Sequence, residues 1–520
     1  MAKRIAIIGA GLSGLLACKY AISKGFDPIV FEAKDELGGV WIKTVKSTRL
    51  QTPKMVYQFS DFPWPDSVSD MFPTQQQVFD YIRSYAAHFD LHKHIRFNSR
   101  VLSIDLDGSS EDEMQGWSFW GGNGDPFNST RRWNLSVENT KTRSPEFFQA
   151  EFIILCVGRF SDVPNLPEYP FGKGPEEFLG QVVHSSDYSN MDHNKAQEFV
   201  KGKRVSVVGF QKSALDIAME SSSVNGSEFP CNVLYRSEHW NLPDYMPWGV
   251  PLALLFMNRL GELLVHKPGE GLLLFILAVL LSPLRYLFCK FVESHIRRKN
   301  RLARYGMVPS HGFLQDFNAC LVASVPEKFY DQVENGSIKL RKAPSFSFVR
   351  DGIVLHGGNE AETLETDIVV LATGFKGEEK IQQMFEKKEF QSIISGSSHA
   401  RLPLYRECIN PRIPHLAIIG FSEGLANLFT SEIRCRWLME LLDGTFKLPC
   451  IDEMEKDIAE WDRYMKRYSG RYYRRACVGG LHIWYNDQLC KDMGWKRLRK
   501  KNFLAELLEP YGPMDYVSPN

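Results

Sequence analysis

The sequence has no excess of charge of either sign. Lysine plus arginine number 62 and aspartate plus glutamate also number 62, which gives a formal net charge of +0. Because a nucleic-acid partner requires a basic surface that neutralises phosphates, this balance argues against nucleic-acid binding. Hydrophobic residues make up 44% and charged residues 24% of the 520 residues, as in soluble folded domains. Since this length exceeds what one hydrophobic core usually fills, we expect two domains.

Paired cysteines and metal-binding clusters are also missing from the sequence. The ten cysteines are scattered from Cys18 to Cys490, with no Cys-x-x-Cys pair and no Cys/His cluster at zinc spacing. We therefore expect reduced thiols, no metal site and no dithiol electron relay of the thioredoxin reductase kind. An apolar segment follows the first few residues directly and leaves no room for a cleavable signal, so we expect a cytoplasmic protein.

The first 32 residues have the pattern of a dinucleotide-binding βαβ unit. An apolar segment at 5–8 leads into the loop Gly9-Ala10-Gly11-Leu12-Ser13-Gly14, a helical segment, and a second apolar segment that ends at Glu32. In such a unit the three glycines allow the tight turn, the approach of a pyrophosphate and the packing of helix on strand. Glu32 is placed to accept the ribose hydroxyls, while the helix N-terminus attracts the phosphates. Gly39 and Trp41 follow and favour FAD over NAD, although Trp41 equally fits a core position.

A second strand and loop of the same kind begin at Val205. This loop is Gly209-Phe210-Gln211-Lys212-Ser213-Ala214, with Gln211 in place of the second glycine and Ala214 in place of the third. The fit to a pyrophosphate is therefore looser. After the next strand, Arg236-Ser237 stands at the position where an acidic residue would select NAD. An arginine there can bind a ribose 2′-phosphate through two N–H groups, so we predict NADPH, with a surface ion pair of Arg236 as the alternative.

A third pattern lies between the two loops. Phe178, Gly180, His184 and Tyr188 resemble the Phe-x-Gly-x3-His-x3-Tyr signature of the flavin-containing monooxygenases. The segments 60–65 and 372–375 also resemble segments of that family, so the resemblance covers almost the whole chain. It is closest to the plant members, particularly the clade of the pipecolate N-hydroxylase. Related Baeyer-Villiger enzymes have tryptophan in place of Tyr188, so the resemblance implies the N- and S-oxygenating branch.

The resemblance implies a reaction and its cofactors. With FAD, NADPH and O2, such an enzyme oxygenates the nucleophilic nitrogen of a small amine or amino acid through a C4a-hydroperoxyflavin; S-oxygenation of thioethers is the neighbouring activity. Gln51 stands where many members have an active-site asparagine, and it is our candidate catalytic residue. We expect His184 to fix a domain junction rather than move protons. An NAD(P)H-dependent flavin reductase or electron-transfer protein, and a cofactor-binding protein without turnover, remain as alternatives.

The order of these segments predicts an α/β fold with two Rossmann-like dinucleotide-binding domains, the NADPH domain being inserted into the FAD domain. We place the first part of the FAD domain at 1–170, the NADPH domain at 171–343 and the second part of the FAD domain at 344–520. Apolar strands at 367–372 and 416–420 are assigned to this second part. The pattern Thr74-x-x-Gln77 predicts a capping box at the start of a helix.

The NADPH domain also carries an unbroken apolar segment at 271–281. It is shorter than the about 20 residues that span a bilayer. We expect burial in the protein, as a channel lid or a subunit contact in an oligomer. The alternative is a peripheral contact of 271–288 with a membrane such as the endoplasmic reticulum, helped by basic residues downstream such as Arg297 and Arg298.

Overall fold

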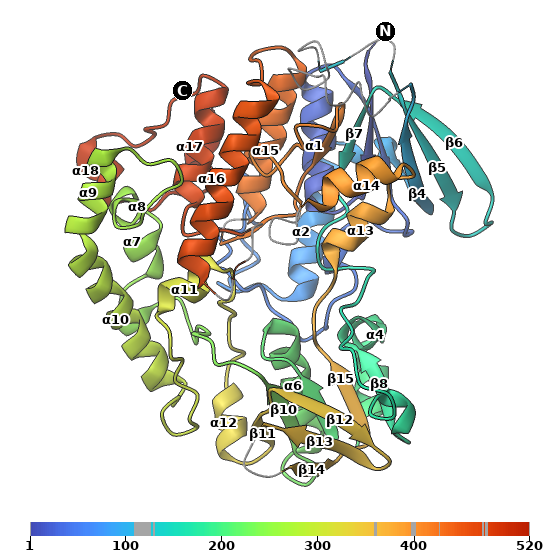
Figure 1. Cartoon of the computed structure of the whole chain (residues 1–520), viewed down its shortest axis with the longest axis vertical. Coiled ribbons are helices and arrows are strands. Elements are labelled where there is room, and N and C mark those ends of the chain that lie inside the picture. The colour runs from blue at the N-terminus through green and yellow to red at the C-terminus, as the bar shows by residue number, and fades with distance from the viewer. Residues whose placement is uncertain are drawn as a thin grey trace.

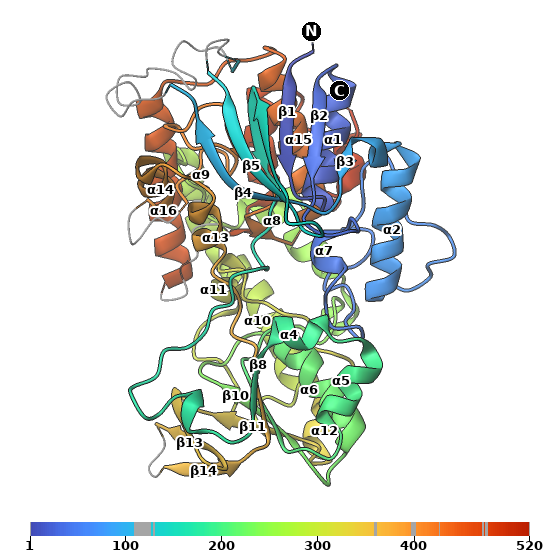
Figure 2. The ribbon, with the colours of Figure 1, turned by 90° about the vertical axis from the view of Figure 1, so that its right-hand side faces the viewer.

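The chain folds into two lobes that lie one above the other (Figure 1). A computed structural model describes residues 2–108, 126–127, 131–357, 361–396, 402–425, 427–470, 473 and 477–518. Each lobe contains one five-stranded parallel sheet. Several chain segments join the lobes at a narrower middle (Figure 2). The predicted α/β fold with two Rossmann-like units is confirmed.

The upper sheet has the strand order β16-β7-β1-β2-β3. Its strands are β1 (Arg4–Ile8), β2 (Asp27–Phe31), β3 (Ile95–Arg96), β7 (Phe152–Leu155) and β16 (Leu416–Ile418). Strand β7 is buried along its whole length, as expected for a parallel strand covered on both faces. Helices α1 (Leu12–Ser23) and α15 (Asn427–Leu442) pack against each other beside this sheet. Segments more than 400 residues apart in the sequence therefore form one unit.

The lower sheet has the strand order β11-β10-β9-β15-β8. Its strands are β8 (Gln181–His184), β9 (Val205–Val208), β10 (Cys231–Tyr235), β11 (Ile338–Lys342) and β15 (Ile368–Leu371). Strand β15 pairs with both β9 and β8, so it belongs to the inserted unit. The predicted return to the FAD domain at 344 is therefore wrong, and the chain leaves the lower sheet only after Leu371. A short apolar strand indicates a buried parallel sheet but does not indicate which of two sheets it joins.

Smaller sheets flank the two parallel ones. An antiparallel sheet in the upper lobe contains β4 (Ser99–Leu106), β5 (Trp133–Asn139) and β6 (Pro145–Ala150). Its counterpart in the lower lobe contains β12 (Ser345–Val349), β13 (Gly352–His356) and β14 (Glu362–Glu365). Strands β17 (Glu423–Gly424) and β18 (Cys477–Gly479) form a short parallel pair.

Helices surround these sheets. The helix predicted from the capping box is α2 (Gln75–His88): Thr74 N–H donates to Gln77 Oε1 at 2.8 Å, and Gln77 N–H donates to Thr74 Oγ1 at 3.3 Å. Helix α6 (Lys212–Asn225) follows β9 as α1 follows β1. The other α-helices are α4 (Ser185–Asn190), α5 (His193–Val200), α7 (Leu252–Phe256), α8 (Arg259–Leu263), α9 (Leu272–Leu280), α10 (Ser282–Lys299), α11 (Phe313–Asn318), α12 (Phe329–Glu334), α13 (Gly377–Gln383), α14 (Lys388–Ser395), α16 (Ile451–Ser469), α17 (His482–Asp492) and α18 (Phe503–Leu508).

One disulfide joins distant parts of the chain. Cys320, just after α11, is bonded to Cys477 at the start of β18, across 157 residues of sequence. The other eight cysteines are free thiols, and seven of them are buried. The expectation that all ten cysteines are reduced is therefore wrong for this pair. Spacing along the sequence did not reveal it, because the two residues meet only in the folded chain.

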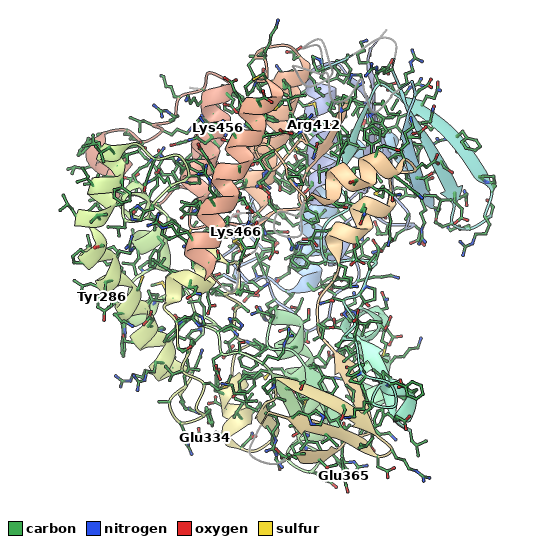
Figure 3. The ribbon with its side chains drawn as sticks, in the orientation of Figure 1. Tyr286, Glu334, Glu365, Arg412, Lys456 and Lys466 are labelled. Atoms are coloured by element: carbon green, nitrogen blue, oxygen red, sulfur yellow. A yellow bond between two sulfur atoms is a disulfide. The ribbon has the colours of Figure 1, made fainter. Side chains whose placement is uncertain are left out.

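The apolar segment at 271–281 is exposed on the single chain, so its own fold does not bury it, while burial at a subunit contact stays a prediction. It forms α9, in which only Ala278 is buried while Leu272 and Leu273 are 75% and 80% exposed. Tyr286, on the outer side of the following helix α10, is also exposed (Figure 3). Among the described residues no single helix is long and apolar enough to cross a membrane. Helices α9 and α10 together, with a bend of 51° between them, have the length and composition of a membrane-crossing segment.

Candidate active site

The first glycine loop has the backbone that a dinucleotide requires. Gly9 has φ of +103°, and a Cβ there would lie 2.6 Å from the carbonyl oxygen of Cys156 on the neighbouring strand. A Cβ on Gly14 would lie 1.9 Å from the carbonyl oxygen of Gly9, so helix α1 can pack this closely only because residue 14 lacks a side chain. Gly11 faces Gly39, whose Cα lies 3.5 Å from the Cβ position. Leu12 and Ser13 begin helix α1, where the first N–H groups have no partner inside the helix.

Glu32 and Trp41 lie beside this loop. Glu32 is buried, and its Oε2 accepts the N–H of Ala10 at 2.8 Å while Oε1 accepts the N–H of Lys34 at 3.0 Å. A carboxylate has about four acceptor positions, so ribose hydroxyls can bind in addition. The N–H of Gly38 donates to the carbonyl oxygen of Ala10 at 2.9 Å, which places the segment from Gly39 to Trp41 against the loop. These residues fit an FAD at this position.

The second glycine loop differs from the first in how its side chains are used. Gly209 has φ of +133°, and a Cβ there would lie 2.5 Å from the carbonyl oxygen of Ala372. Gln211 Nε2 donates to the carbonyl oxygen of Leu321 at 3.1 Å, so the long side chain is bonded to a neighbouring segment. Phe210 and Ala214 are buried in the lower core, while Ser213 is exposed in the first turn of α6. The loop thus keeps its turn without the second glycine.

Arg236 follows strand β10 beside this loop. It is exposed, and it forms no ion pair with any residue that the structure describes. Ser237 next to it is half-buried. The alternative role for Arg236, as a surface ion-pair partner, therefore has no support in this part of the chain. An exposed guanidinium at the end of the second strand fits a ribose 2′-phosphate, because its N–H groups match phosphate oxygens.

The candidate catalytic residue Gln51 lies where the lobes meet. Its Oε1 accepts the N–H of Ser324 at 3.3 Å, three residues after the carbonyl group that Gln211 binds. Gln51 Nε2 has no hydrogen-bond partner among the described residues and remains able to donate. Gln51 from the upper lobe and Gln211 from the second glycine loop thus both bind the short segment 321–324.

A second contact between the lobes was not expected from the sequence. Lys212 Nζ lies 2.5 Å from Asp216 Oδ1, and the other carboxylate oxygen accepts the hydroxyl of Thr48 from the upper lobe. Burial raises the pKa of Asp216, and the charge of Lys212 opposes this effect. The spacing of Lys212 and Asp216, four residues apart on a helix, is the sequence signal that could have revealed the pair.

His184 fixes the junction between the lobes. It is buried at the end of β8, its Nδ1 accepts the N–H of Ser186 at 3.2 Å, and its Nε2 donates to the carbonyl oxygen of Gly374 at 3.0 Å. Burial lowers the pKa of His184, so the imidazole is neutral at pH 7. Gly374 lies in the segment that returns to the upper lobe, and this segment pairs with the outgoing one through Asn165. These contacts support a structural role for His184.

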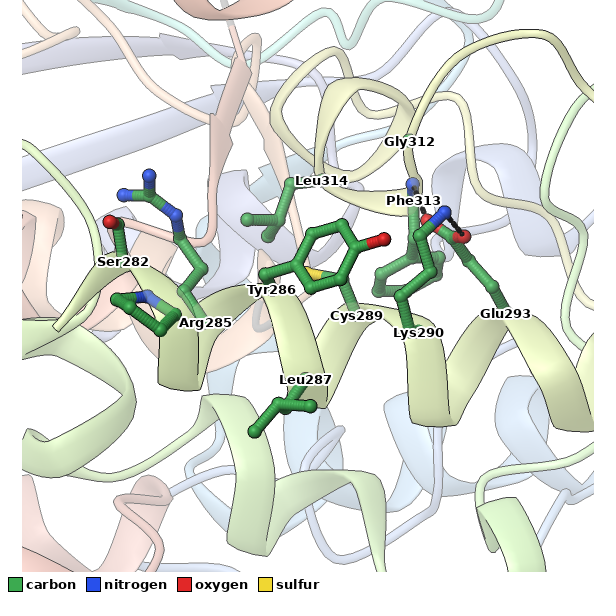
Figure 4. Close-up of a pocket in the computed structure, with 11 residues that line it drawn as sticks. Ser282, Arg285, Tyr286, Leu287, Cys289, Lys290, Glu293, Gly312, Phe313 and Leu314 are labelled. Carbon is green, nitrogen blue, oxygen red and sulfur yellow. Dashed lines mark hydrogen bonds and ion pairs between the residues drawn. The ribbon is translucent and has the colours of Figure 1, made fainter.

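The described residues include a cavity of about 780 Å³ that is separate from both glycine loops. It lies between the first half of α10 and residues 312–314, and Tyr286, Lys290 and Phe313 are among its lining residues (Figure 4). Glu293 binds both Lys290 and the N–H of Phe313 at its edge. No residue predicted from the glycine loops lines it.

The folded chain also gathers three residues that sequence spacing did not connect. His239, His311 and Asp316 offer ligand atoms that lie within 4.8 Å of one another. They come from the loop after β10, from the segment before α11 and from α11 itself. Their separation in the sequence explains why the search for Cys/His clusters at metal spacing did not find them.

Known proteins resemble this chain in sequence and in architecture. The flavin-binding monooxygenase-like family matches residues 2–505. A probable flavin-containing monooxygenase 1 of Arabidopsis thaliana is 38% identical over 99% of this chain and 96% of its own length, and human flavin-containing monooxygenase 5 is 27% identical over 95% of this chain and 83% of its own. Among solved structures, an oxidised steroid monooxygenase bound to NADP has a TM-score of 0.64 at 19% identity, over 94% of this chain and 97% of its own. The S-allyl-L-cysteine S-oxygenase of Allium sativum has a TM-score of 0.60 at 16% identity, over 95% of this chain and 89% of its own.

Proposed function

Because this chain belongs to the flavin-binding monooxygenase-like family and is a flavin-dependent monooxygenase, we propose that it uses NADPH and O2 to oxygenate the nucleophilic nitrogen of a small amine or amino acid. FAD occupies the first glycine loop and NADPH the second. The observation that carries this assignment is the contrast after the second strand of each unit. Glu32, buried against the first loop, suits ribose hydroxyls, whereas the exposed and unpaired Arg236 suits a 2′-phosphate.

The residues of this chain bind, orient and separate the two cofactors. The N-termini of α1 and α6 attract the pyrophosphates, and Glu32 fixes the adenosine ribose of FAD. Two contacts hold the two lobes in a fixed relative position: Thr48–Asp216–Lys212 and Gln51–Ser324. When bound, FAD and NADPH would supply the redox chemistry of the reaction with O2. Gln51 Nε2 is a donor at the junction, placed to orient either cofactor.

The choice of nitrogen as the oxygenated atom rests on Tyr188 and on the similarity to the plant clade. The substrate supplies its own lone pair, so no nucleophile or general base from the protein is required. Sulfur is the second candidate, because thioethers offer a lone pair of the same kind and because a solved S-oxygenase shares this fold. That likeness, at 16% identity, concerns the fold alone.

A substrate screen tests the proposal. The FAD-loaded enzyme is incubated with NADPH, air and one compound at a time: primary amines, cyclic amino acids such as pipecolate, or thioethers. We expect a gain of one oxygen atom on nitrogen, with NADPH and O2 consumed in equal amounts. Oxygenation of thioethers alone would assign sulfur instead. NADPH oxidation with electron transfer to a quinone, and no oxygenated product in any class, would contradict the proposal.

We also propose that α9 and the first half of α10 contact a membrane surface from the cytoplasmic side. Leu272, Leu273, Leu280, Tyr286 and Leu287, here called the apolar patch, are each at least 60% exposed. The last turn of α10 carries Arg297, Arg298 and Lys299. An apolar face with basic residues further along the same helix matches an interfacial segment that binds anionic lipid. This combination favours a membrane over a second protein chain as the occupant.

Liposome flotation tests the membrane proposal. We expect the protein to float with vesicles that contain phosphatidylserine, and we expect the double variant Leu273→Glu, Leu280→Glu to remain in the lower fraction with its FAD content unchanged. The matched control is Phe147→Glu, which changes an 80% exposed aromatic residue on β6 far from the apolar patch. Equal flotation of the double variant and the wild type, or no flotation of either, would exclude the proposal.

A further inference from the structure

His239, His311 and Asp316 converge on one point in the lower lobe. His239 Nδ1 lies 3.0 Å from Asp316 Oδ1, and His311 Nε2 lies 2.8 Å from the same oxygen. The side chain of Asp316 is fully buried, and the two histidine side chains are 12% and 9% exposed. From these residues we propose a binding site for one divalent metal ion of the zinc class, held by two imidazoles and one carboxylate.

The distances suit such an ion. Zinc binds imidazole nitrogen and carboxylate oxygen at about 2.0–2.2 Å, so donor atoms around a tetrahedral ion lie roughly 3.3–3.6 Å apart. The observed separations from Asp316 Oδ1 are shorter by a few tenths of an ångström, and all three donor atoms lie within 4.8 Å of one another. A small outward movement of the two rings therefore opens the site. Two imidazoles and one carboxylate leave a fourth position for water.

The orientation of the carboxylate is fixed by its second oxygen. Asp316 Oδ2 accepts the N–H of Trp240 at 2.8 Å, which leaves Oδ1 to face the two histidines. Trp240 Nε1 in turn donates to the carbonyl oxygen of His311 at 2.7 Å, so the two histidine segments are bound to each other. Hydrogen bonds of this kind hold metal ligands in place and strengthen metal binding. The three donor groups are thus positioned before any ion binds.

The burial of the Asp316 carboxylate also favours a bound cation. The side chain of Asp316 is fully buried, and its Oδ1 lies within 3.0 Å of a ring nitrogen of each histidine. Among the described residues its ion-pair partners are these two histidines, with no lysine or arginine. A buried carboxylate requires a compensating charge. Either a proton on an imidazole or a bound metal ion supplies it, and two imidazoles on one oxygen favour the metal.

The position of the site links it to the cofactor. His239 lies three residues after Arg236, on the loop that leaves β10. A bound ion would fasten this loop to α11 and so hold Arg236 in place for the 2′-phosphate. This consequence rests on the proposed function, whereas metal binding itself does not.

Metal analysis of the full-length, FAD-loaded protein tests the site. The protein is stripped with a chelator, incubated with Zn2+ or Co2+, desalted and analysed by mass spectrometry of the metal, with the Co2+ difference spectrum as a report on the ligands. We expect about one ion per chain in the wild type. Removal of an outer hydrogen-bond partner lowers metal affinity by about 10–100-fold, and removal of a direct ligand lowers it further. Asp316→Asn and His311→Gln should therefore retain no ion after desalting.

The matched control is His295→Gln, which changes a buried histidine that faces one carboxylate, Asp244, and no second histidine among the residues that the structure describes. It should retain the ion. If Asp316→Asn does not fold, as judged by lost FAD, His239→Gln at the rim of the site carries the test. No ion in the desalted wild type, or equal binding by wild type and Asp316→Asn, overturns the proposal. We also expect the stripped protein to have a higher KM for NADPH than the metal-loaded protein, with unchanged FAD content. Equal KM values, in a protein shown to bind the ion, would count against the link to the cofactor alone.

Discussion

Nε2 of His184 donates a hydrogen bond to the carbonyl oxygen of Gly374 at 3.0 Å, which joins the start of the inserted lobe to the segment that returns from it. The signature histidine is therefore a positioning residue at the hinge between the two cofactor units. It is neutral, because burial lowers its pKa, and both ring nitrogens are already used within the protein.

Replacing His184 by alanine should make the relative position of the two lobes less fixed. It should not remove a group that carries protons in the reaction. Loss of the buried hydrogen bonds costs about 1–3 kcal/mol of folding stability, and we expect a higher KM for NADPH and more peroxide released per NADPH. The shape of the pH–rate profile should not change. His92→Ala, at an exposed histidine, is the control. Disappearance of one limb of the pH profile in His184→Ala would instead show that His184 moves a proton.

Replacing Arg236 by alanine should weaken NADPH binding and leave NADH almost unaffected. A charge-assisted contact to phosphate contributes about 1.5–3 kcal/mol, which corresponds to a rise of about 10–100-fold in the KM for NADPH. Steady-state kinetics with both nucleotides measure this. Arg341→Ala is a suitable comparison, because Arg341 lies on the neighbouring strand β11 and pairs with Glu362. Equal losses with NADPH and NADH would place the 2′-phosphate elsewhere.

The stability of the protein should fall below pH 6.5 partly because of His482. Burial, with a smaller effect of the Arg259 charge, lowers the pKa of His482 from 6.5 to about 4. Between these values the unfolded chain binds more protons than the folded one, so stability is complete above pH 6.5 and is lost as the pH falls toward 4. The full effect is about 3 kcal/mol. Thermal unfolding of His482→Gln should depend less steeply on pH than that of His92→Gln, and identical slopes would contradict this.

The rate of N-oxygenation should rise with pH toward the pKa of the substrate amine. Only the uncharged amine has a free lone pair, and alkyl amines such as the lysine side chain have pKa values near 10. Single-turnover rates with one amine and one thioether, at the same series of pH values, separate this effect from changes in the enzyme. The thioether rate should stay flat, because sulfur carries no proton. A flat rate for the amine, with the chemical step limiting, is the contrary result.

Local patterns allowed the two cofactor loops to be predicted from the sequence. Gly9, Gly14 and Gly209 are determined by contacts within a single βαβ unit, so spacing along the chain reveals them. The helix start at Thr74 is equally local, since its capping box involves residues three apart.

Features that depend on distant contacts were missed or misassigned. Strand β15 was assigned to the wrong sheet, because its apolar side chains indicate burial and not a partner. The bond between Cys320 and Cys477, and the meeting of His239 with Asp316, join segments far apart in the sequence. The exposure of α9 was missed for a related reason: an apolar run does not indicate whether the fold covers it.

The most direct test of the two-cofactor site is to purify the protein, measure its FAD content and add NADPH without oxygen. We expect about one FAD per chain, rapid bleaching of the flavin absorbance by NADPH, and loss of the yellow colour in Glu32→Ala but not in Glu36→Ala, whose side chain is 38% exposed. A colourless wild-type protein that takes up no added FAD, or a bound flavin that NADPH leaves oxidised, would contradict this assignment.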